Sequence, residues 1–370
     1  MPENKFSAPA PDEVELSIFG PGVGECILLH LGDSEWLIVD SCVHWESQNP
    51  APLEYLKKIG VDVCTAVKCF VASHWHDDHI RGASQIVKEC PNARFVCSSA
   101  LRSDEFFTLV NLQKSALNSG VEEFGNILEE IKRRFMGKNA ETAGPTWASA
   151  ERRLLLLPRG NRRIHAEVFA LSPSDAAFTL ALQELGQLIP APNSSKRRVI
   201  SQQPNHVSVA LWVMIENLYI LLGSDLENRP DENLGWKAVI FSPNRPSGKA
   251  VLVKVPHHGS SNSYSEEMWC EMATPNAIAL LTPFSKGRNP LPNERGIKNI
   301  QKHTNRIYIT GEVHRGHPPK MDPAVNRTIR EMLRTRRVVH GPMGHVRVRC
   351  SVLRSTLEPK IELFNGAKQI

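Results

Sequence analysis

Three histidines and two aspartates crowd into the seven-residue segment Ser73–His79. His74 and His76 are two positions apart and can point the same way from an extended loop, whereas Asp78 and His79 fall on the next turn. Imidazole nitrogens and carboxylate oxygens are ligands that suit Zn²⁺, Mn²⁺ and Fe²⁺. One short loop can therefore hold two adjacent metal ions.

This cluster directly follows an apolar segment, residues 66–73, that is expected to be a buried strand. The alternative interpretation is a solvated polar loop with incidental histidines. We disfavour it because burying so many polar groups beside a core strand, without partners, would be costly.

Two further groups of candidate ligands also come at the ends of expected strands. Asp225 follows the apolar residues Tyr219–Leu222, and His257–Ser260 follows Val251–Val255. Taken alone, an aspartate after a strand is usually a turn former or helix cap, and His-His-Gly is a structural turn. Beside the first cluster, both are expected to complete a metal site.

The order of these motifs resembles that of the metallo-β-lactamase-fold hydrolases. The resemblance is carried by HxHxDH at 74–79, by Asp225 after a strand and by His-His-Gly-Ser at 257–260. Among those hydrolases, the chain is most similar to the metallo-hydrolase domain of ComEC-type DNA-uptake proteins and their soluble relatives. The similar part runs from Glu13 to Gly311 and includes Gly22–Leu28, Leu37–Asp40 and Val253–Ser260. It implies an α/β fold, the four-layer αββα metallo-β-lactamase sandwich with a helical insertion.

The resemblance also implies roles for individual residues. The implied metal ligands are His74 and His76 for the first ion, Asp78, His79 and His258 for the second, and Asp225 as the bridge between the two. We favour His258 as the ligand and His257 as a substrate-facing or supporting group, but the sequence leaves these two interchangeable. Catalytic roles fall to Asp78 and His257. Asp40, at the end of the third strand, corresponds to the family's buried aspartate that supports the ligand loop.

Three residues near the expected site, Ser260, Asn205 and His206, are assigned to substrate binding. His206 is also a candidate ligand for the first ion, because many family members offer a histidine just before the corresponding hairpin. ComEC-like members have an Asn-rich segment there without that ligand, so a plain strand residue is the alternative. Relatives often show Asn followed by His-Pro where this chain reads Arg288–Pro292, and the missing histidine removes the support for a catalytic role of that loop.

Apolar and alternating segments predict the elements that position these residues. The expected strands cover residues 14–18, 25–29, 35–40, 66–73, 93–97, 164–170, 208–214, 218–222, 251–255, 277–281 and 306–310. The expected helices cover residues 52–59, 82–90, 103–117, 120–135, 175–188, 265–272 and 294–302. This alternation is an α/β rhythm.

We expect residues 1–311 to form the hydrolase domain, with a helical cap inserted at about 101–200 and a linker at 190–198. Residues 312–370 are expected to be a basic extension packed on the core, because 346–353 alternates like a strand. This extension carries 12 Lys and Arg against 5 Asp and Glu, a net charge of +7 in a chain whose net charge is +5. His345, within it, is expected at the surface. Candidates for phosphate contact in or beside the insertion are Arg134, Arg153, Arg163 and Arg198, with a solvated surface as the alternative.

These observations predict a hydrolase that depends on two divalent metals, with Zn²⁺ first and Mn²⁺ or Fe²⁺ as alternatives. The leading hypothesis is a phosphodiesterase or nuclease that acts through a metal-bridging hydroxide. Its partner would be nucleic acid or a small phosphodiester, since basic residues in the insertion and tail could hold a polyanion. The alternatives are hydrolysis of a small lactam, lactone or thioester, a di-iron redox centre, and a non-catalytic metal-stabilised interaction module.

The remaining composition is that of a globular protein. Hydrophobic residues make up 41% of the chain, which is enough for a substantial core. The N-terminus lacks the layout of a signal peptide, and no segment is apolar and long enough to span a membrane. The eight cysteines form no CxxC pair, so we expect reduced thiols in a soluble, cytoplasmic protein with no membrane partner.

Overall fold

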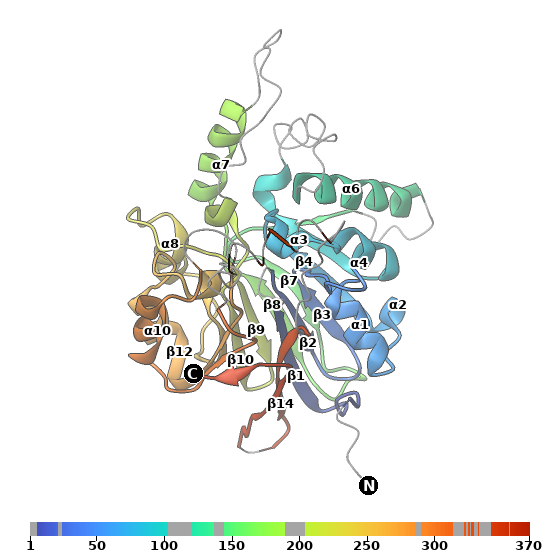
Figure 1. The fold of residues 1–370 in the computed structure, drawn as a ribbon. Coiled ribbons are helices and arrows are strands. Elements are labelled where there is room, and N and C mark those ends of the chain that lie inside the picture. Colours follow the sequence, from blue (N-terminus) through green and yellow to red (C-terminus); the bar gives the residue numbers. More distant parts are fainter. Residues whose placement is uncertain are drawn as a thin grey trace.

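Two eight-stranded sheets lie face to face in the computed structural model (Figure 1). It describes residues 6–20, 24–102, 120–136, 144–188, 204–285, 290–313, 322, 325, 327–328, 332, 342–354 and 356–370. The first sheet consists, in spatial order, of β15 (Lys360–Phe364), β14 (Gly344–Ser351), β1 (Glu13–Gly20), β2 (Cys26–His30), β3 (Trp36–Val39), β4 (Val67–Ala72), β5 (Arg94–Ser98) and β6 (Thr146–Ala148). The second consists of β16 (Lys368–Gln369), β13 (Ile307–Ile309), β12 (Ala273–Leu281), β11 (Ala250–Lys254), β10 (Leu218–Leu222), β9 (Leu211–Ile215), β8 (Ala166–Ala170) and β7 (Arg153–Leu157).

The two-residue period of the strands separates the core into layers. In β1, Val14, Leu16 and Ile18 enter the core between the sheets, whereas Phe19 packs under the helices on the outer face. The helices of the first sheet are α1 (Ala51–Lys58), α2 (Val63–Ala66), α3 (Asp77–Ile80), α4 (Ala83–Glu89) and α6 (Gly120–Met136). Those of the second are α8 (Gly235–Phe241), α9 (Glu266–Met272) and α10 (Glu294–Gln301), while α7 (Asp175–Leu188) stands above the sandwich (Figure 1).

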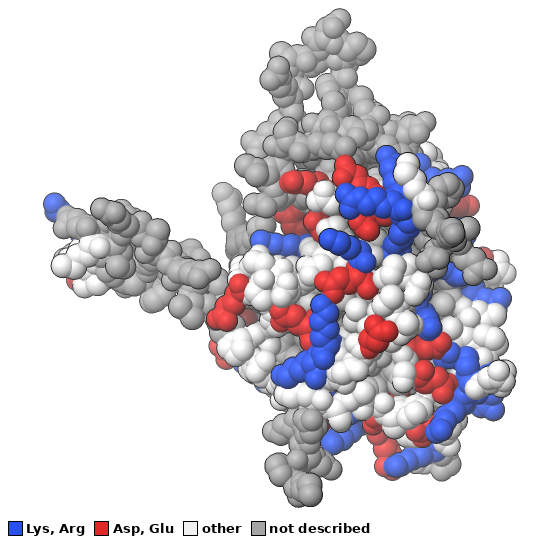
Figure 2. Space-filling model, turned by 90° about the vertical axis from the view of Figure 1, so that its right-hand side faces the viewer, with Lys and Arg blue, Asp and Glu red and all other residues white. Residues whose placement is uncertain are grey.

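This arrangement confirms the predicted αββα sandwich and its α/β rhythm. The outer face of α1, α4 and α6 carries interspersed charges, as Figure 2 shows for that side of the molecule. Ion pairs such as Lys57–Glu89 at 2.6 Å and Arg133–Glu130 at 2.8 Å contribute to this mixed pattern. None of the described helices combines the length and the apolar character needed to cross a membrane.

The predicted helical cap at 101–200 is corrected in part. Its helices at 120–135 and 175–188 are present as α6 and α7, but residues 146–170 contribute β6, β7 and β8 to the edges of the two sheets. These strands extend the central sandwich because apolar side chains such as Leu154 and Val168 enter the inter-sheet core. The predicted helix at 103–117 and the linker at 190–198 lie outside the described residues.

The C-terminal part of the chain contributes strands to both sheets. β14 pairs with β1 along its whole length and β16 pairs with β13, although the predicted boundary after residue 311 stays a prediction. His345 was expected at the surface, and this was wrong. The residue is 4% exposed and its ring stacks on Phe19 with 4.2 Å between ring centroids, because β14 lies between β1 and β15 in the sheet and the ring also packs against Tyr55 of α1 and Phe364 of β15.

The sheet topology brings several loops to one edge. β3 and β4 are parallel, as are β10 and β11, so their carboxyl ends open at the top of the sandwich in Figure 1. Asp40, the segment 73–79, Asp225 and His257–Ser260 follow these four strands. The edge therefore gathers the six metal ligands that the resemblance implied, His74, His76, Asp78, His79, Asp225 and His258.

His30 makes stability depend on pH far from this edge. Its Nδ1 donates to Glu13 O at 2.7 Å, and its Nε2 accepts from Ser34 N at 3.0 Å. Burial lowers the pKa of His30 to about 4. The ordinary pKa of a histidine is near 6.5. Between pH 6.5 and about pH 4, the unfolded chain therefore binds a proton at His30 that the folded chain does not, so stability falls as the pH falls. A shift of this size corresponds to about 3 kcal/mol.

We expect the His30→Gln variant to lose much of this pH dependence, because glutamine does not titrate. The measurement is urea unfolding of both metal-free proteins at pH 7 and pH 4.5. The difference between the two pH values should be about 2 kcal/mol smaller in the variant. Parallel stability curves for the two proteins would show that His30 does not contribute.

Candidate metal centre

A single buried carboxylate organises the ligand loop that follows β4. Asp40, at a positive φ of 59° just after β3, accepts hydrogen bonds from Ser73 N at 2.7 Å and Ser73 Oγ at 2.8 Å. The same carboxylate accepts from His79 Nδ1 at 2.7 Å. Asp40 thus fixes both the start of the loop and the ring of His79, which is the supporting role assigned to it from sequence.

The first group of candidate ligands consists of His74, His76 and Asp225, whose ligand atoms lie within 4.8 Å of one another. His74 Nε2 is 3.1 Å from His76 Nδ1 and 3.9 Å from Asp225 Oδ2. On the other side of the ring, His74 Nδ1 lies 2.9 Å from Ser73 Oγ. That hydroxyl donates to Asp40, so it must accept a hydrogen bond from His74 Nδ1. In a neutral His74 ring the proton is then on Nδ1, and the lone pair of Nε2 faces the other candidate ligands.

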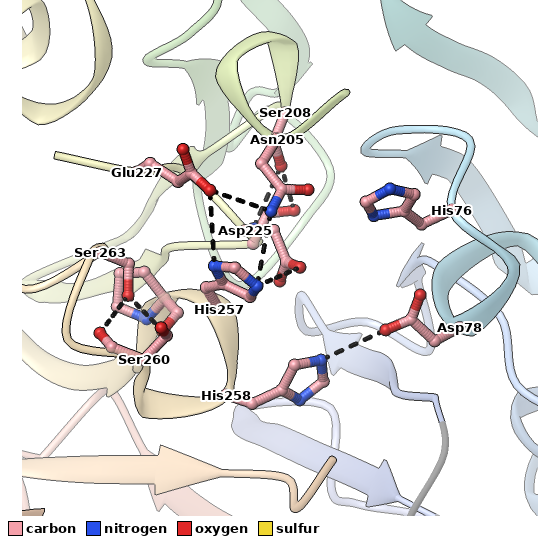
Figure 3. Close-up of polar contacts among 12 residues, drawn as sticks. His76, Asp78, Asn205, Ser208, Asp225, Glu227, His257, His258, Ser260 and Ser263 are labelled. Carbon is pink, nitrogen blue, oxygen red and sulfur yellow. Dashed lines mark hydrogen bonds and ion pairs between the residues drawn. The ribbon is translucent and has the colours of Figure 1, made fainter. Parts of the chain in front are cut away.

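The second group consists of Asp78, His79, Asp225 and His258. His79 Nε2 lies 3.3 Å from Asp225 Oδ1 and 3.6 Å from Asp78 Oδ2, and His258 Nε2 lies 3.4 Å from the same Asp78 oxygen. Asp225 therefore belongs to both groups, one oxygen turned to each. The other members come from two loops, Asp78 and His79 from the loop after β4 and His258 from the turn after β11, as Figure 3 shows for Asp78 and His258.

The donor atoms of the second group fit a divalent cation. His79 Nε2, His258 Nε2 and Asp225 Oδ1 are buried and make no hydrogen bond within the described part of the chain. Since His79 donates its Nδ1 proton to Asp40, a neutral His79 ring would turn the lone pair of Nε2 toward Asp78 and Asp225. Lone pairs and carboxylate oxygens at these distances repel one another unless a cation or a proton lies between them.

The charges of the centre depend on one another. Burial by itself lowers the pKa of His79, but the carboxylates of Asp225, Asp78 and Asp40 raise it well above its ordinary value. Conversely, burial by itself raises the pKa of Asp225, but His79 and His257 hold it well below its ordinary value. Against the effect of burial, Glu25 and Asp78 likewise raise the pKa of His258, whereas burial lowers that of His74. A metal in the second group would therefore displace protons from His79 and His258.

Strained turns aim the ligands of the second sheet. Ser224, His257 and His258 have positive φ angles of 44°, 47° and 51°, and the His257 N–H donates to Ser224 O at 2.7 Å. Gly259 also has a positive φ, and a Cβ there would lie 2.8 Å from Leu281 Cδ2. The His-His-Gly turn therefore needs its glycine, and its strain is typical of a functional site.

His257 belongs to neither metal group, but it lies beside Asp225 and has further polar partners (Figure 3). Its Nε2 is 3.8 Å from Asp225 Oδ2, and its Nδ1 is 3.9 Å from Glu227 Oε1. Asn205 Nδ2 is 3.2 Å from that Glu227 oxygen and 3.4 Å from His257 Nε2. The His257 side chain is 20% exposed, so it can meet a substrate.

The structure places two of the predicted substrate-binding residues away from the ligands. His206 is 3% exposed and its Nε2 lies 3.2 Å from Glu184 Oε2 of α7; it belongs to none of the metal groups of the described residues. The short turn at Pro204–Val207 directs the ring toward α7, so this geometry does not support the first-ion role considered for His206, which stays a prediction. Ser260 follows the His-His-Gly turn, where its carbonyl accepts from Ser263 Oγ at 2.8 Å.

Sequence reasoning missed three buried polar residues behind the second group: Glu25, Lys254 and Thr282. Glu25 Oε1 pairs with Lys254 Nζ at 2.8 Å, and Glu25 Oε2 accepts from Thr282 Oγ1. Burial by itself raises the pKa of Glu25, but Lys254 and His258 bring it below its ordinary value. The signal available was a charged residue in each of two apolar strand segments, 25–29 and 251–255.

Comparisons with known proteins give one family match, over the N-terminal part of the chain. Residues 19–131 match the family model of the metallo-beta-lactamase superfamily. No curated protein matches the chain. Among solved structures, the metallo-beta-lactamase fold protein YhfI from Bacillus subtilis is 11% identical, with 80% of this chain and 95% of that chain covered and a TM-score of 0.39. Human tRNase Z, short form, is 10% identical, with 70% and 85% covered and a TM-score of 0.31.

Structural likenesses this weak carry no argument about activity. The family match, by contrast, includes Asp40 and the complete ligand loop 73–79. Residues 19–131 are therefore similar to the metallo-beta-lactamase superfamily, and the two facing sheets with their outer helices are consistent with the αββα sandwich of that superfamily.

Proposed function

We propose that the chain is a phosphodiesterase that depends on two divalent metal ions. The observation that carries this proposal is the position of Asp225, which belongs to both groups of candidate ligands. A carboxylate shared by two metal groups keeps two cations close together. Paired ions suit the displacement at a phosphodiester, because they stabilise charge on both the attacking and the leaving oxygen.

We propose that the residues divide between the two ions as the resemblance implies. His74, His76 and Asp225 would hold one ion, and Asp78, His79, Asp225 and His258 the other. Bound divalent metals would supply Lewis acidity and a nucleophile at neutral pH. We propose Zn²⁺, since imidazole nitrogens supply much of the donor set.

We propose that His257 acts as a general acid, which donates a proton to the leaving group. Its partial exposure and its place beside Asp225 support a position of Nε2 where a leaving oxygen would arrive, while Glu227 on the Nδ1 side would orient the ring. A protonated His257 would donate from Nε2 to the leaving group, and Glu227 would stabilise the charged imidazole. Asp78 keeps its proposed role as a ligand and electrostatic partner of the second group.

The described basic residues of the insertion give little support to a polymeric substrate. Arg134 donates to the carbonyls of Ala93 and Cys90 at 3.0 and 2.9 Å, and Arg153 pairs with Glu167 at 3.0 Å. Arg198 and the tail arginines 334, 336 and 337 lie outside the described residues. The proposal therefore names phosphodiesters as the class, with a nuclease of the ComEC type as its more specific form.

A substrate panel tests the class directly. The purified protein should hydrolyse bis-p-nitrophenyl phosphate in a metal-dependent manner and leave a cephalosporin intact. Cleavage of single-stranded DNA, with binding that weakens by a log–log salt slope of about −0.7 per phosphate contact, would favour the nuclease form. Activity on the cephalosporin alone would instead favour the lactam alternative, and bound metal without any turnover would favour an interaction module.

Replacing the shared carboxylate should affect both ions at once. We expect Asp225→Asn to weaken metal binding and to lower hydrolysis of bis-p-nitrophenyl phosphate by more than about a hundredfold, because an uncharged amide cannot compensate two cations. Metal analysis after dialysis and steady-state kinetics measure the two effects. Glu232→Gln, at an exposed carboxylate near Asp225 in sequence, serves as the control. Two tightly bound ions in Asp225→Asn would remove Asp225 from the centre.

The role of His257 should depend on the leaving group. With bis-p-nitrophenyl phosphate the leaving group needs no proton, so His257→Gln should retain most of the activity. With a dinucleotide the leaving alkoxide needs one, and the variant should lose about a hundredfold in kcat/KM. Glu227→Gln should show the same trend more weakly. Equal losses on both substrates, at full metal content, would contradict proton donation by His257.

A further inference from the structure

Glu25 lies behind the second group of ligands and touches it from two sides. It directly precedes β2 and is 1% exposed. Its backbone N–H donates to Asp78 O at 2.9 Å, so it holds the ligand loop of the first sheet. Its carboxylate points toward the second sheet, where Lys254 Nζ of β11 lies 2.8 Å from Oε1. Glu25 therefore joins the two sheets directly under the candidate metal centre.

The partners of the Glu25 carboxylate are themselves buried. Lys254 is 1% exposed and also donates to Val255 O at 2.9 Å. Thr282, just after β12, is fully buried and donates from Oγ1 to Glu25 Oε2. A buried carboxylate with an ammonium and a hydroxyl donor is well satisfied, whereas either partner alone would leave charge uncompensated.

The direction of these hydrogen bonds fixes the orientation of His258. Because a carboxylate only accepts, the Thr282 hydroxyl gives its proton to Glu25 and must accept from its other neighbour. That neighbour is His258 Nδ1, 2.8 Å from Thr282 Oγ1, with Thr282 O at 3.2 Å as a further acceptor. The proton of the neutral ring is therefore on Nδ1, and the lone pair of Nε2 is directed at Asp78.

The two ligand groups share one support, since Asp40 holds both Ser73 and the His79 ring, but Glu25 contacts imidazoles of the second group. His74 in the first group is oriented by Ser73 Oγ at 2.9 Å. In the second group, Glu25 approaches both imidazoles, with Oε2 at 3.4 Å from His258 Nδ1 and Oε1 at 3.8 Å from His79 Nδ1. The contacts of Glu25 thus converge on the second group.

We propose that Glu25, Thr282 and Lys254 form a positioning unit that sets the affinity of the second metal ion separately from that of the first. This inference rests on the proposed function, because it presumes an ion in each group. The three residues touch no ion themselves. They act by fixing the ring of His258 and the loop that carries Asp78, and by holding a negative charge near both imidazoles of the second group.

The sharpest test is a pair of substitutions at Thr282. Thr282→Val keeps the shape of the side chain and removes the hydroxyl, whereas Thr282→Ser keeps the hydroxyl. Zn²⁺ affinity is measured by competition with a chromogenic chelator, and stoichiometry by metal analysis after dialysis. In Thr282→Val, we expect the second ion to bind about 10–100-fold more weakly and the first unchanged. Thr282→Ser should bind both ions as the unsubstituted protein does.

A second pair of variants covers the carboxylate. Glu25→Gln should also bind the second ion more weakly and leave the affinity for the first ion unchanged. Glu15→Gln is the matched control, because Glu15 is a fully buried carboxylate that pairs with Arg349 Nη2 at 2.8 Å on the outer face of the first sheet. This control should keep both ions even where its stability falls. Unfolding of the metal-free variants separates a loss of stability from a loss of metal affinity. If a variant of the Thr282 pair does not fold, the Glu25 and Glu15 variants test the proposal, and the reverse also holds.

Three results are informative beyond the expected one. Unchanged binding of both ions in Thr282→Val and Glu25→Gln would overturn the positioning unit, and so would an equal weakening of both ions. If the unsubstituted protein binds no metal, the proposed function itself fails and this inference falls with it. Two ions in the unsubstituted protein, with unchanged variants, would leave the proposed function intact and reject only the positioning unit.

Discussion

The buried carboxylate of Asp225 sets the main constraint on this molecule. It is 2% exposed, and its two oxygens face imidazoles from different ligand groups, His79 at 3.3 Å and His74 at 3.9 Å. A carboxylate this deep in a protein is costly unless positive charge lies beside it. Three loops, after β4, β10 and β11, must therefore meet at one point, and the parallel strand pairs of the two sheets make that meeting possible.

The candidate centre also couples the sheets to each other. The first sheet supplies the ligand loop and Asp40, while the second supplies Asp225 and His258. Hydrogen bonds cross between them near the centre, including Val209 N to Ser73 O at 3.1 Å, and so does the Glu25–Lys254 ion pair. Ions bound between the sheets would stabilise the closed sandwich by mass action, so folding and metal binding are expected to be linked.

Much of this architecture could be predicted from sequence because it depends on local patterns. Alternating apolar residues predicted strands such as 14–18 and 218–222, and histidines and aspartates at strand ends predicted which loops would meet. The sequence could not predict that 146–157 would add β6 and β7 to the two sheets, since short strands at sheet edges depend on pairing with distant partners. It also did not predict the direction of the His206 ring, which is determined by a contact with Glu184 of α7.

The buried polar residues behind the centre were hidden for a related reason. Glu25 and Lys254 are 229 positions apart in the chain and become partners only when the sheets close. Viewed singly in the sequence, each reads as a polar interruption of an apolar strand. Burying either charge without a partner would cost free energy. A charged residue within such a strand therefore indicates an opposite charge elsewhere in the core.

The same reasoning changes the interpretation of the basic tail. The net charge counts every cationic side chain, whether or not a substrate could reach it. Arg347 is 2% exposed and pairs with Glu362 at 2.8 Å, and Arg349 pairs with Glu15 at 2.8 Å. These arginines fasten β14 to its neighbours in the first sheet. The positive charge of the tail is thus partly structural, and it gives weaker support to a polyanionic substrate than its sum implies. The case for phosphodiester chemistry rests instead on the paired ligand groups and on His257, whose ring is half-buried beside them.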